Sequence, residues 1–413
     1  LHVSSCFPRK GIDVLLKAYK NAFTSNDDVS LIIKTFDNLH NDIDLQLEKL
    51  RKSYSDFPDV VVIKDDLDET QIKSLYEHAN LLVAPSRGEG FGLPIAEAML
   101  LGIPVITTNW GGQLDFVNSD NSWLIDFEFS SSRSHFNLDM SYWAEPSVNH
   151  LSKLLTDLHR LPNVEIEKKL AHAKDTIKSF TWSKVAQKNK EFVISSRFRL
   201  RKKSKIGWVS TWNSNCGISS YSNRLTINFR DELVRFSPYH DNNSNNNVIP
   251  SWDFHGSTSK NLDYLFLSVV KESITTLVIQ FNYGFFDFEQ LSSFITKCNE
   301  IDINVILFLH STIDPDNQKN KKLSSIADAL NLCKRIFVHT YADLNRLKIL
   351  GLIANVSLFP HGIIDTVGKT KSLHKFFSGF QTKKEFNVAS YGFCLPNKGL
   401  IELIEAVNIL KNK

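Results

Sequence analysis

Cysteine is scarce in this 413-residue chain and is not arranged for metal or disulfide chemistry. The five cysteines are odd in number and widely scattered, and no two of them form a Cys-x-x-Cys pair. This spacing predicts neither a zinc site nor a disulfide framework, so no metal is expected and a reducing compartment is the simpler interpretation. Their positions are Cys6, Cys216, Cys298, Cys333 and Cys394.

The sequence also lacks an excess of one charge and a long apolar run. A formal net charge of +3 gives no sign of a surface for nucleic acid. No apolar run reaches about 18 residues, so no membrane span is predicted. With 42% hydrophobic and 23% charged residues, the composition is that of a soluble globular protein, and the length suffices for two or three domains. We therefore expect a cytoplasmic protein.

Both ends of the chain lie inside predicted elements. Residues 1–5 have the pattern of a strand, without an initiator Met or a signal peptide. Residues 408–413 have the pattern of a helix. We therefore expect the sequence to be a fragment, truncated at both ends.

From residue 1 to about 128, short apolar runs alternate with helical patterns. Buried continuous runs separated by helices predict a parallel sheet in a doubly wound α/β domain. A Ser-rich loop is expected over residues 129–145, followed by helices at 146–161, at 164–179 and after Thr181. The predicted strands are 30–34, 60–63, 81–84 and 104–107, and the predicted helices between them are 12–22, 43–52, 69–79 and 94–101.

A second α/β pattern begins at residues 206–210, after a basic run over 197–205. That run is predicted to be a solvated linker, and contact with an anionic membrane surface is the alternative. Later strands are predicted at 276–280, 305–309 and 335–339, a polar loop at 241–247, and the start of a third segment at 386–390.

The chemistry-bearing stretch of the first segment joins a strand to a helix at residues 86–97. Gly90 and Gly92 let the backbone approach a ligand, and the helix start offers free N–H groups and a positive dipole end that suit a diphosphate. Glu89 before the helix and Glu97 one turn into it can accept hydrogen bonds from sugar hydroxyls. Either glutamate alone is typical of a solvated surface, but the whole arrangement indicates a sugar-nucleotide site.

The two glutamates with seven residues between them resemble the signature of the retaining glycosyltransferases of family four. That family has an architecture of two Rossmann-like domains, called GT-B. The flanking residues 81–86 and 98–106 are similar to the family as well. The resemblance implies that Glu89 holds the hydroxyls of the donor sugar and that Glu97 holds the ribose. It also implies that the donor sugar and phosphates face the backbone of Gly90, Phe91, Gly92 and Leu93.

Residues 8–11, Pro-Arg-Lys-Gly, resemble the basic phosphate-binding turn of the same family. Lys10 is the main candidate and Arg9 the second, because cations stabilise the charge of a departing diphosphate without a metal. No cofactor is therefore expected, since the nucleotide sugar is a substrate. Many family members carry another Arg earlier in this strand and loop, where this chain has serines and a cysteine at 4–6.

The second α/β segment resembles the acceptor-side domain of the family. Gly217 lies in its first strand-to-helix loop, and His310 lies at a strand end where the family carries a His near the reacting sugar. Residues 359–362 resemble the interdomain hinge. A partial repeat of residues 7–11 at 395–399 then assigns to Lys398 the phosphate-binding role of Lys10.

The resemblance implies two GT-B modules in tandem. Residues 1–195 would be the donor-binding (C-terminal) domain of a first glycosyltransferase, and 196–204 a basic linker. Residues 205–361 would be the acceptor-side (N-terminal) domain of a second, 362–385 a linker, and 386–413 the start of its donor-binding domain.

The expected function is retaining transfer of a hexose, with mannose as the first guess, from a nucleotide sugar. The acceptor would be a glycan or lipid-linked molecule in the biosynthesis of a cell-envelope polysaccharide, at the inner face of the membrane. Two alternatives stay open: a non-catalytic module that binds sugar or nucleotide, and a GT-B-fold sugar-nucleotide epimerase. A nicotinamide dehydrogenase is disfavoured because no Gly-x-Gly-x-x-Gly opens either α/β segment.

Overall fold

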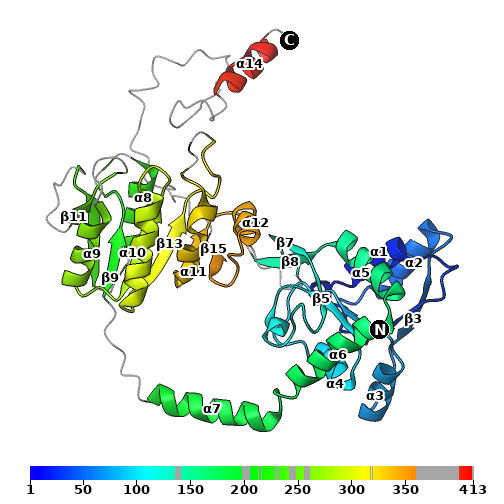
Figure 1. The fold of residues 1–413 in the computed structure, drawn as a ribbon. Coiled ribbons are helices and arrows are strands. Elements are labelled where there is room, and N and C mark those ends of the chain that lie inside the picture. Colours follow the sequence, from blue (N-terminus) through cyan, green and yellow to red (C-terminus); the bar gives the residue numbers. More distant parts are fainter. Residues whose placement is uncertain are drawn as a thin grey trace. The chain divides into compact units, whose positions relative to one another are not determined.

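The computed structural model of the chain (Figure 1) describes residues 1–134, 141–197, 205–359 and 400–411. Within these ranges, residues 213, 215, 228, 230–231, 241–247, 255–260, 317 and 319 lie outside the description. Contacts divide the chain into a unit Leu1–His361 and a unit Gly362–Lys413. In the second unit the structure describes the helix α14 (Leu400–Lys411).

The first part of the chain forms two three-stranded parallel sheets, ordered β1-β2-β3 and β4-β5-β6. The backbone N–H of Val83 donates to the carbonyl of Leu1 (2.9 Å), which places β4 beside β1. The six strands then follow the order β3-β2-β1-β4-β5-β6 of a doubly wound fold. Their bounds are β1 (His2–Val3), β2 (Ser30–Lys34), β3 (Asp59–Ile63), β4 (Leu82–Ala84), β5 (Val105–Thr108) and β6 (Trp123–Ile125).

Helices bury apolar stripes against these sheets in two separate clusters. One cluster combines side chains of α1, α2 and α5, and the other combines side chains of α3, α4 and α6. Leu15 and Leu16 of α1 are fully buried, as the helical spacing of apolar residues predicts. The helices are α1 (Ile12–Ala22), α2 (Ile43–Ser53), α3 (Glu69–Glu77), α4 (Leu93–Leu101), α5 (Val148–Arg160), α6 (Asn163–Ile177) and α7 (Trp182–Arg197).

The prediction of a Ser-rich loop over residues 129–145 is wrong at both ends. The strands β7 (Phe127–Ser131) and β8 (Tyr142–Pro146) form an antiparallel hairpin, in which Phe129 lies opposite Ala144. Phe127 and Phe129 alternate with polar residues and are buried, so a two-residue period is present although serines obscure it. Pro146, predicted to open a helix, ends β8 instead, and Ser147 caps the following α5.

Within the unit Leu1–His361, this hairpin contacts the helix α12 (Tyr341–Ile349). The side-chain amide of Asn345 accepts from the N–H of Phe129 (2.7 Å) and donates to its carbonyl (3.1 Å). The ammonium of Lys348 donates to the carbonyl of Phe127. The hairpin backbone is thus paired by side chains of α12.

Residues 206–358 form a seven-stranded sheet in which every pairing is parallel. Its order is β11-β10-β9-β12-β13-β14-β15. The predicted α/β fold with parallel sheets is confirmed, although β10 and β11 carry no strand prediction. The bounds are β9 (Ile206–Val209), β10 (Leu233–Pro238), β11 (Val248–Trp252), β12 (Thr276–Phe281), β13 (Asn304–Leu309), β14 (Arg335–Val338) and β15 (Val356–Leu358).

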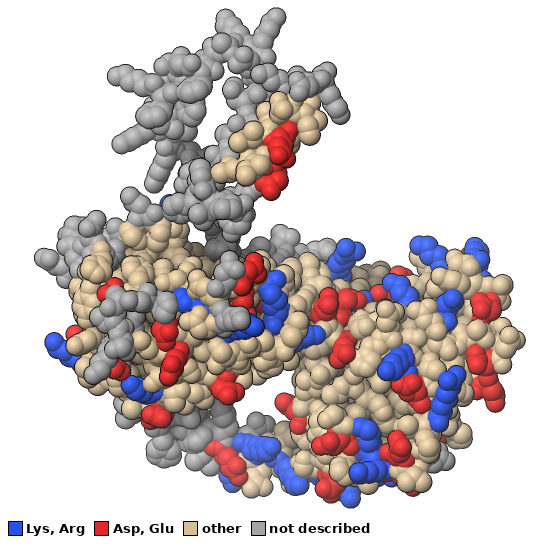
Figure 2. All heavy atoms as spheres, turned by 45° about the horizontal axis from the view of Figure 1, so that its top comes forward, with Lys and Arg blue, Asp and Glu red and all other residues tan. Residues whose placement is uncertain are grey.

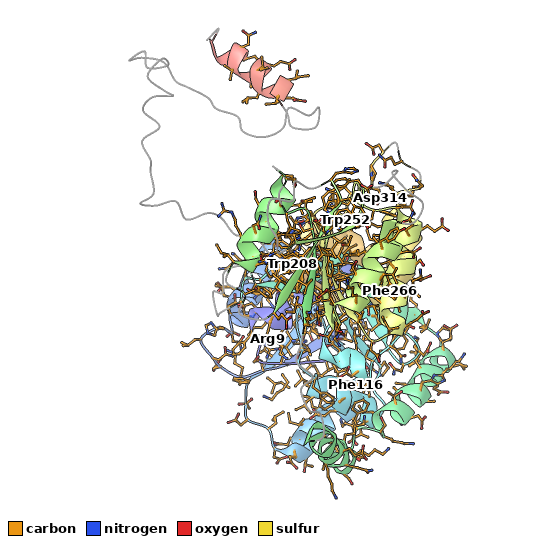
Figure 3. The ribbon with its side chains drawn as sticks, turned by 90° about the vertical axis from the view of Figure 1, so that its left-hand side faces the viewer. Arg9, Phe116, Trp208, Trp252, Phe266 and Asp314 are labelled. Carbon is orange, nitrogen blue, oxygen red and sulfur yellow. The ribbon has the colours of Figure 1, made fainter. Side chains whose placement is uncertain are left out.

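Aromatic side chains fill the core around this sheet. Trp252, Phe281 and Phe286 are each at most 1% exposed. Trp208 on β9 and Trp252 on β11 are labelled among the strands in Figure 3. The other helices here are α8 (Gly217–Thr226), α9 (Asn261–Lys271), α10 (Phe288–Glu300) and α11 (Ala327–Leu332).

The surface shown in Figure 2 carries basic and acidic side chains intermixed over the described residues. Among the helices that the structure describes, none combines the length and the apolar character needed to cross a membrane.

Candidate functional site

Two loops that follow neighbouring strands of the first part meet at the carboxyl ends of β1 and β4. The first contains a short 3-10 helix, η1 (Pro8–Lys10), and ends at Gly11 with a φ of 69°. A Cβ at Gly11 would lie 2.0 Å from the carbonyl oxygen of Pro85. Glycine is therefore required here both by the left-handed backbone and by the close approach of the second loop.

Lys10 and Glu89 form an ion pair between these loops. The Lys10 Nζ lies 2.5 Å from Glu89 Oε1, and the two side chains are only 14% and 9% exposed. The hydroxyl of Ser86 donates to the same carboxylate oxygen (2.7 Å). Arg9 Nη1 donates to the carbonyl of Gly88 (3.1 Å) and lies 3.7 Å from Glu89 Oε2. The structure thus brings the three predicted charged residues together, although their roles stay predictions.

The N-terminus of α4 lies next to this pair in the chain. Gly92 is the N-cap residue with a φ of 89°, and Pro94 lies in the first turn, where no intrahelical partner for its nitrogen is needed. The Phe91 ring packs against Phe116 at a centroid distance of 4.9 Å. Leu93 is 59% exposed, and a Cβ at Gly90 would meet no atom within 4 Å.

Glu97 is exposed on α4, and one of its carboxylate oxygens accepts a hydrogen bond from a buried tyrosine. The hydroxyl of Tyr76, on α3, donates to Glu97 Oε2 (3.0 Å). Tyr76 is 1% exposed, and its burial together with the neighbouring carboxylate raises the pKa of its phenol. The sequence analysis gave Tyr76 no role at the site. Its apolar position in a predicted helix indicated only that it would be buried.

Arg87 is a second residue that sequence reasoning missed. It is 6% exposed and makes bidentate contacts with two carboxylates, those of Asp13 and Glu145. Burial opposes its charge, but the hydrogen bonds to both carboxylates outweigh this effect and raise the pKa of Arg87. Burial of Asp13 would raise the pKa of its carboxyl group. The Arg87 guanidinium stabilises the ionised carboxylate by more than this, so the pKa of Asp13 is lowered.

A third wall of the site comes from the loop after β5. The N–H of Gly112 donates to the carbonyl of Glu89 (2.9 Å), and a Cβ on Gly112 would lie 1.9 Å from the carbonyl oxygen of Gly90. Gly111 has a φ of 122°. The Gly-Gly pair in the sequence was the available signal, since two glycines after a buried strand indicate close backbone packing.

In the second part, three polar side chains meet at the carboxyl ends of β12, β13 and β14. His310 Nε2 lies 2.8 Å from Gln280 Oε1, and His310 Nδ1 lies 3.3 Å from His339 Nε2. His339 Nδ1 lies 2.7 Å from the carbonyl of Phe359 and therefore carries a hydrogen. The predicted His310 thus lies at the edge of a parallel sheet where α/β ligands bind, within a polar cluster that the sequence did not reveal.

Gly217 is the first residue of α8, and an added Cβ would meet nothing within 4 Å. The thiol of Cys216 caps this helix by accepting from the N–H of Ser219 (3.4 Å). Tyr221 of α8 packs edge-on against His310 at a centroid distance of 5.0 Å. Lys398 and the hinge residues 360–362 lie outside the described residues, as does most of the basic run at 197–205.

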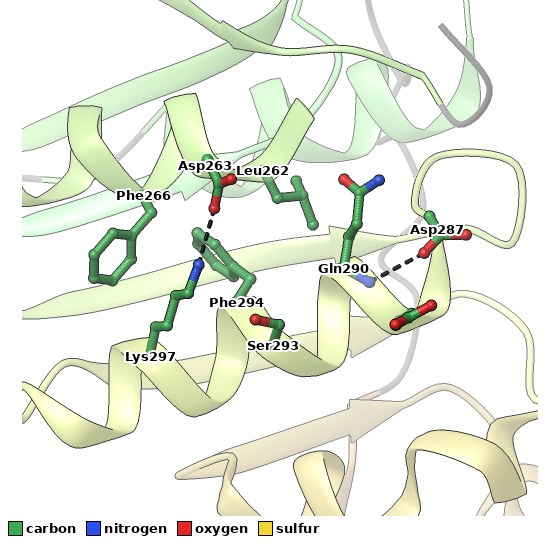
Figure 4. A pocket seen from close by; sticks show the side chains of 9 residues that line it. Leu262, Asp263, Phe266, Asp287, Gln290, Ser293, Phe294 and Lys297 are labelled. Carbon is green, nitrogen blue, oxygen red and sulfur yellow. Dashed lines mark hydrogen bonds and ion pairs between the residues drawn. The ribbon is translucent and has the colours of Figure 1, made fainter. Parts of the chain in front are cut away.

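Two further observations bear on what the protein could bind. Among the described residues, no group of three or more His, Cys, Asp or Glu could hold a metal ion. A surface groove of about 480 Å³ lies between α9 and α10 and is crossed by the ion pair of Lys297 with Asp263, 2.9 Å (Figure 4). None of the candidate residues lines this groove.

The decisive comparison concerns the part of the chain that holds Lys10, Glu89 and Glu97. Residues 1–134 match the family of glycosyl transferases group 1. This match spans the basic turn, the glutamate-bounded loop and the loop at Gly112, and it agrees with the resemblance to GT-B enzymes of family four.

Two curated relatives are similar to part of the chain. The capsular polysaccharide biosynthesis glycosyltransferase CapM of Staphylococcus aureus is 33% identical over 118 residues, covering 28% of this chain and 30% of that protein. The O-antigen chain mannosyltransferase B of Escherichia coli is 33% identical over 112 residues, covering 26% and 28%. The chain therefore spans about a third or less of the length of these two relatives.

Solved structures with partial similarity include a glycosyltransferase from Rickettsia africae. It is 18% identical, with a TM-score of 0.39 and coverage of 48% of this chain and 47% of that one. The Anabaena protein HepE, solved in complex with UDP and glucose, is 18% identical, with a TM-score of 0.37 and coverage of 47% of both chains. At these scores the similarities carry no further conclusion.

Proposed function

We propose that this protein is a retaining glycosyltransferase that moves a hexose from a nucleotide sugar to a glycan or lipid-linked acceptor. The observation that carries the proposal is the Lys10–Glu89 pair, held beside the N-terminus of α4 within the group 1 match. A half-buried ammonium, a carboxylate and a helix N-terminus are groups that suit a sugar diphosphate.

The pair has complementary partners in such a donor. The Lys10 ammonium and the Arg9 guanidinium would contact the diphosphate, while the Glu89 carboxylate would accept hydrogen bonds from sugar hydroxyls. Donor binding would then replace the 2.5 Å ion pair by two contacts to one ligand. Glu97 would accept from the ribose, with Tyr76 orienting its carboxylate.

Transfer would depend on cations that stabilise the departing diphosphate. As the bond between the anomeric carbon and the phosphate oxygen breaks, negative charge builds on the diphosphate beside Lys10. By analogy with the family, the acceptor hydroxyl attacks on the face from which the diphosphate leaves, and the leaving phosphate takes the hydroxyl proton. No pair of carboxylates as in a glycosidase is needed.

The narrower parts of the proposal concern substrate and place. Relatives named for capsular polysaccharide and O-antigen chains support an acceptor in surface-polysaccharide synthesis, and a relative named as a mannosyltransferase supports mannose as the hexose. A cytoplasmic protein with peripheral membrane contact through residues 197–205 would meet a lipid-linked acceptor. A tandem of two such modules is part of the same proposal.

The test is donor turnover by the full-length protein with Lys10→Ala and Glu89→Ala. Each variant should lower kcat/KM by about 10²-fold or more, because each removes a charged contact to the donor. Lys52→Ala and Glu48→Ala are matched controls, since they break an exposed ion pair of similar length (2.6 Å) on α2. Unchanged turnover in both site variants would refute the site.

A sugar-binding module without catalysis is the second candidate. Residues 4–6 of this chain stand where many family members carry an additional Arg. Cys6 is buried with a φ of 52°, and the Ser4 hydroxyl forms a hydrogen bond with His2. No cation is therefore supplied from residues 4–6. Donor binding by the full-length protein without transfer to any acceptor would favour this candidate, and an altered sugar in the absence of acceptor would favour an epimerase.

A further inference from the structure

We propose that Arg87 is a positioning residue, which holds the Arg9–Lys10 turn in register with Glu89 and so sets the geometry of donor binding. The proposal rests on the proposed function for the identity of the ligand. It assigns a role to a residue that lies just before the two signature glutamates and to which the sequence analysis gave no role.

Arg87 connects to the basic turn at several atoms. Its N–H donates to the carbonyl of Arg9 (2.7 Å), and its Nη1 donates to the carbonyl of Pro8 (2.6 Å). Its Nη1 and Nη2 also donate to the two carboxylate oxygens of Asp13, at 2.7 and 2.8 Å. Asp13 lies in the first turn of α1, two residues after Gly11. The turn is thus held on both of its flanks by one side chain.

The hairpin holds a second edge of the same guanidinium. Nε and Nη2 each donate to Glu145 on β8, both at 2.6 Å. The Arg87 carbonyl accepts from the N–H of Ala144 (3.2 Å), and its guanidinium carbon lies 4.7 Å from the ring centre of Trp143. The guanidinium is therefore held by two carboxylates and lies over one aromatic ring.

Arg87 precedes Glu89 by two residues in the same loop. A shift of its backbone would displace the Glu89 carboxylate, whereas loss of its side-chain contacts would release Lys10 and Arg9. Positioning matters here because misplacement of a binding group by about 1 Å can cost about 10²-fold in rate. A Lys at position 87 would keep the charge but could not reproduce the two bidentate contacts.

The two carboxylate partners offer a matched comparison. Asp13 and Glu145 have side chains that are each 35% exposed, and each makes two contacts with the same guanidinium. Asp13 adjoins the basic turn, and Glu145 does not. If Arg87 only stabilised the fold, Asp13→Asn and Glu145→Gln would have similar consequences for the site.

The experiment uses the full-length protein, with UDP-glucose and GDP-mannose as probes. Calorimetry gives the Kd, urea unfolding gives the stability, and acetic anhydride labelling read by mass spectrometry gives the reactivity of Lys10. Asp13→Asn and Arg87→Lys should raise the Kd about tenfold or more and speed Lys10 labelling. Glu145→Gln should change both less than threefold at a comparable loss of stability.

Equal effects of Asp13→Asn and Glu145→Gln on the Kd and on Lys10 labelling would overturn the positioning role. In that case Lys10→Ala and Glu89→Ala would still weaken donor binding, so the proposed function would stand. If the wild-type protein bound neither probe and Lys10 labelling did not distinguish the two variants, both proposals would fall.

Discussion

His2 is a buried imidazole at the start of β1, and both of its nitrogens have partners. Nδ1 lies 2.7 Å from the carbonyl of Val83 and donates to it, while Nε2 lies 2.7 Å from the hydroxyl of Ser4. The side chain is 1% exposed. Burial lowers the pKa of His2 from 6.5 to about 4, although the Val83 carbonyl opposes the change. The folded protein therefore holds His2 neutral.

This pKa predicts a specific sensitivity to acid. The unfolded chain binds the His2 proton near pH 6.5 and the folded protein near pH 4, so the free energy of unfolding should fall as the pH is lowered through this window. The loss should be up to about 3 kcal/mol. In His2→Asn the amide can still donate to Val83, yet it does not titrate, so its stability should fall less between pH 7.5 and pH 4.5.

Urea unfolding of both proteins at these two pH values measures the difference. Comparing variants removes the contribution of the other titrating groups, which both proteins share. Parallel pH profiles would show that His2 is not neutral in the folded protein.

At the scale of elements, the candidate site is a junction of loops rather than a feature of one motif. The loop after β4 contacts the loop after β1 through Gly11 and Pro85, and the loop after β5 through Gly90 and Gly112. These glycines differ in what surrounds them. Gly112 is packed against the Gly90 carbonyl, whereas the space beside the Gly90 Cα is open.

That contrast predicts different outcomes for two alanine variants. Gly112→Ala should destabilise the protein by about 1–3 kcal/mol, because its Cβ would lie 1.9 Å from the Gly90 carbonyl oxygen. Gly90→Ala should unfold like the wild type but raise the Kd for a nucleotide sugar, because the methyl group would occupy the space that the ligand approaches. Thermal unfolding and calorimetry on both variants separate the two effects.

Gly351→Ala is a control for backbone strain alone. Gly351 has a φ of 78°, and an added Cβ would meet nothing within 4 Å. Its destabilisation should be smaller than that of Gly112→Ala. If Gly90→Ala binds the donor like the wild type, the backbone at Gly90 does not face the ligand.

At the scale of the whole molecule, the reactivity of the cysteine thiols is a measure of packing in both α/β parts. Cys6 is buried in the first part, and Cys298 and Cys333 in the second. Burial raises the pKa of Cys6 and raises the pKa values of Cys298 and Cys333 to about 12. Cys216 is half-buried. Its burial raises the pKa, but hydrogen bonds from Ser214, Thr211 and the start of α8 outweigh this, so its pKa is lowered.

Thiol labelling of the native protein should therefore modify Cys216 first. The other three should react only after unfolding, because the thiolate is the reactive species and theirs is suppressed. Cys394 lies outside the described residues, so the experiment is performed in a Cys394→Ser background. A disulfide-exchange reagent followed by absorbance gives the rates, and Cys216→Ser should lose the fast phase. Fast labelling of Cys298 would contradict the packing of the second core.

Much of the fold follows from local patterns in the sequence. Apolar runs such as residues 30–34 and 305–309 are buried strands, since a continuous run in a parallel sheet is covered on both faces. The β7–β8 hairpin was missed because a run of serines follows its buried phenylalanines Phe127 and Phe129. The resemblance to a family placed Lys10 and Glu89 in one donor site, but their direct ion pair was not predicted, because 79 positions separate them.

The amino-acid sequence by itself determined the α/β class, the parallel strands and the residue types of the glutamate-bounded loop, because these depend on periodicity and on spacing within about a dozen residues. Only the tertiary structure decided that Arg87 joins Asp13 and Glu145, which lie 74 and 58 positions away. The same holds for Tyr76 and Glu97, and for His310 and His339. A charged side chain is stabilised by whichever partner the fold brings within hydrogen-bonding distance, and no local pattern carries that information.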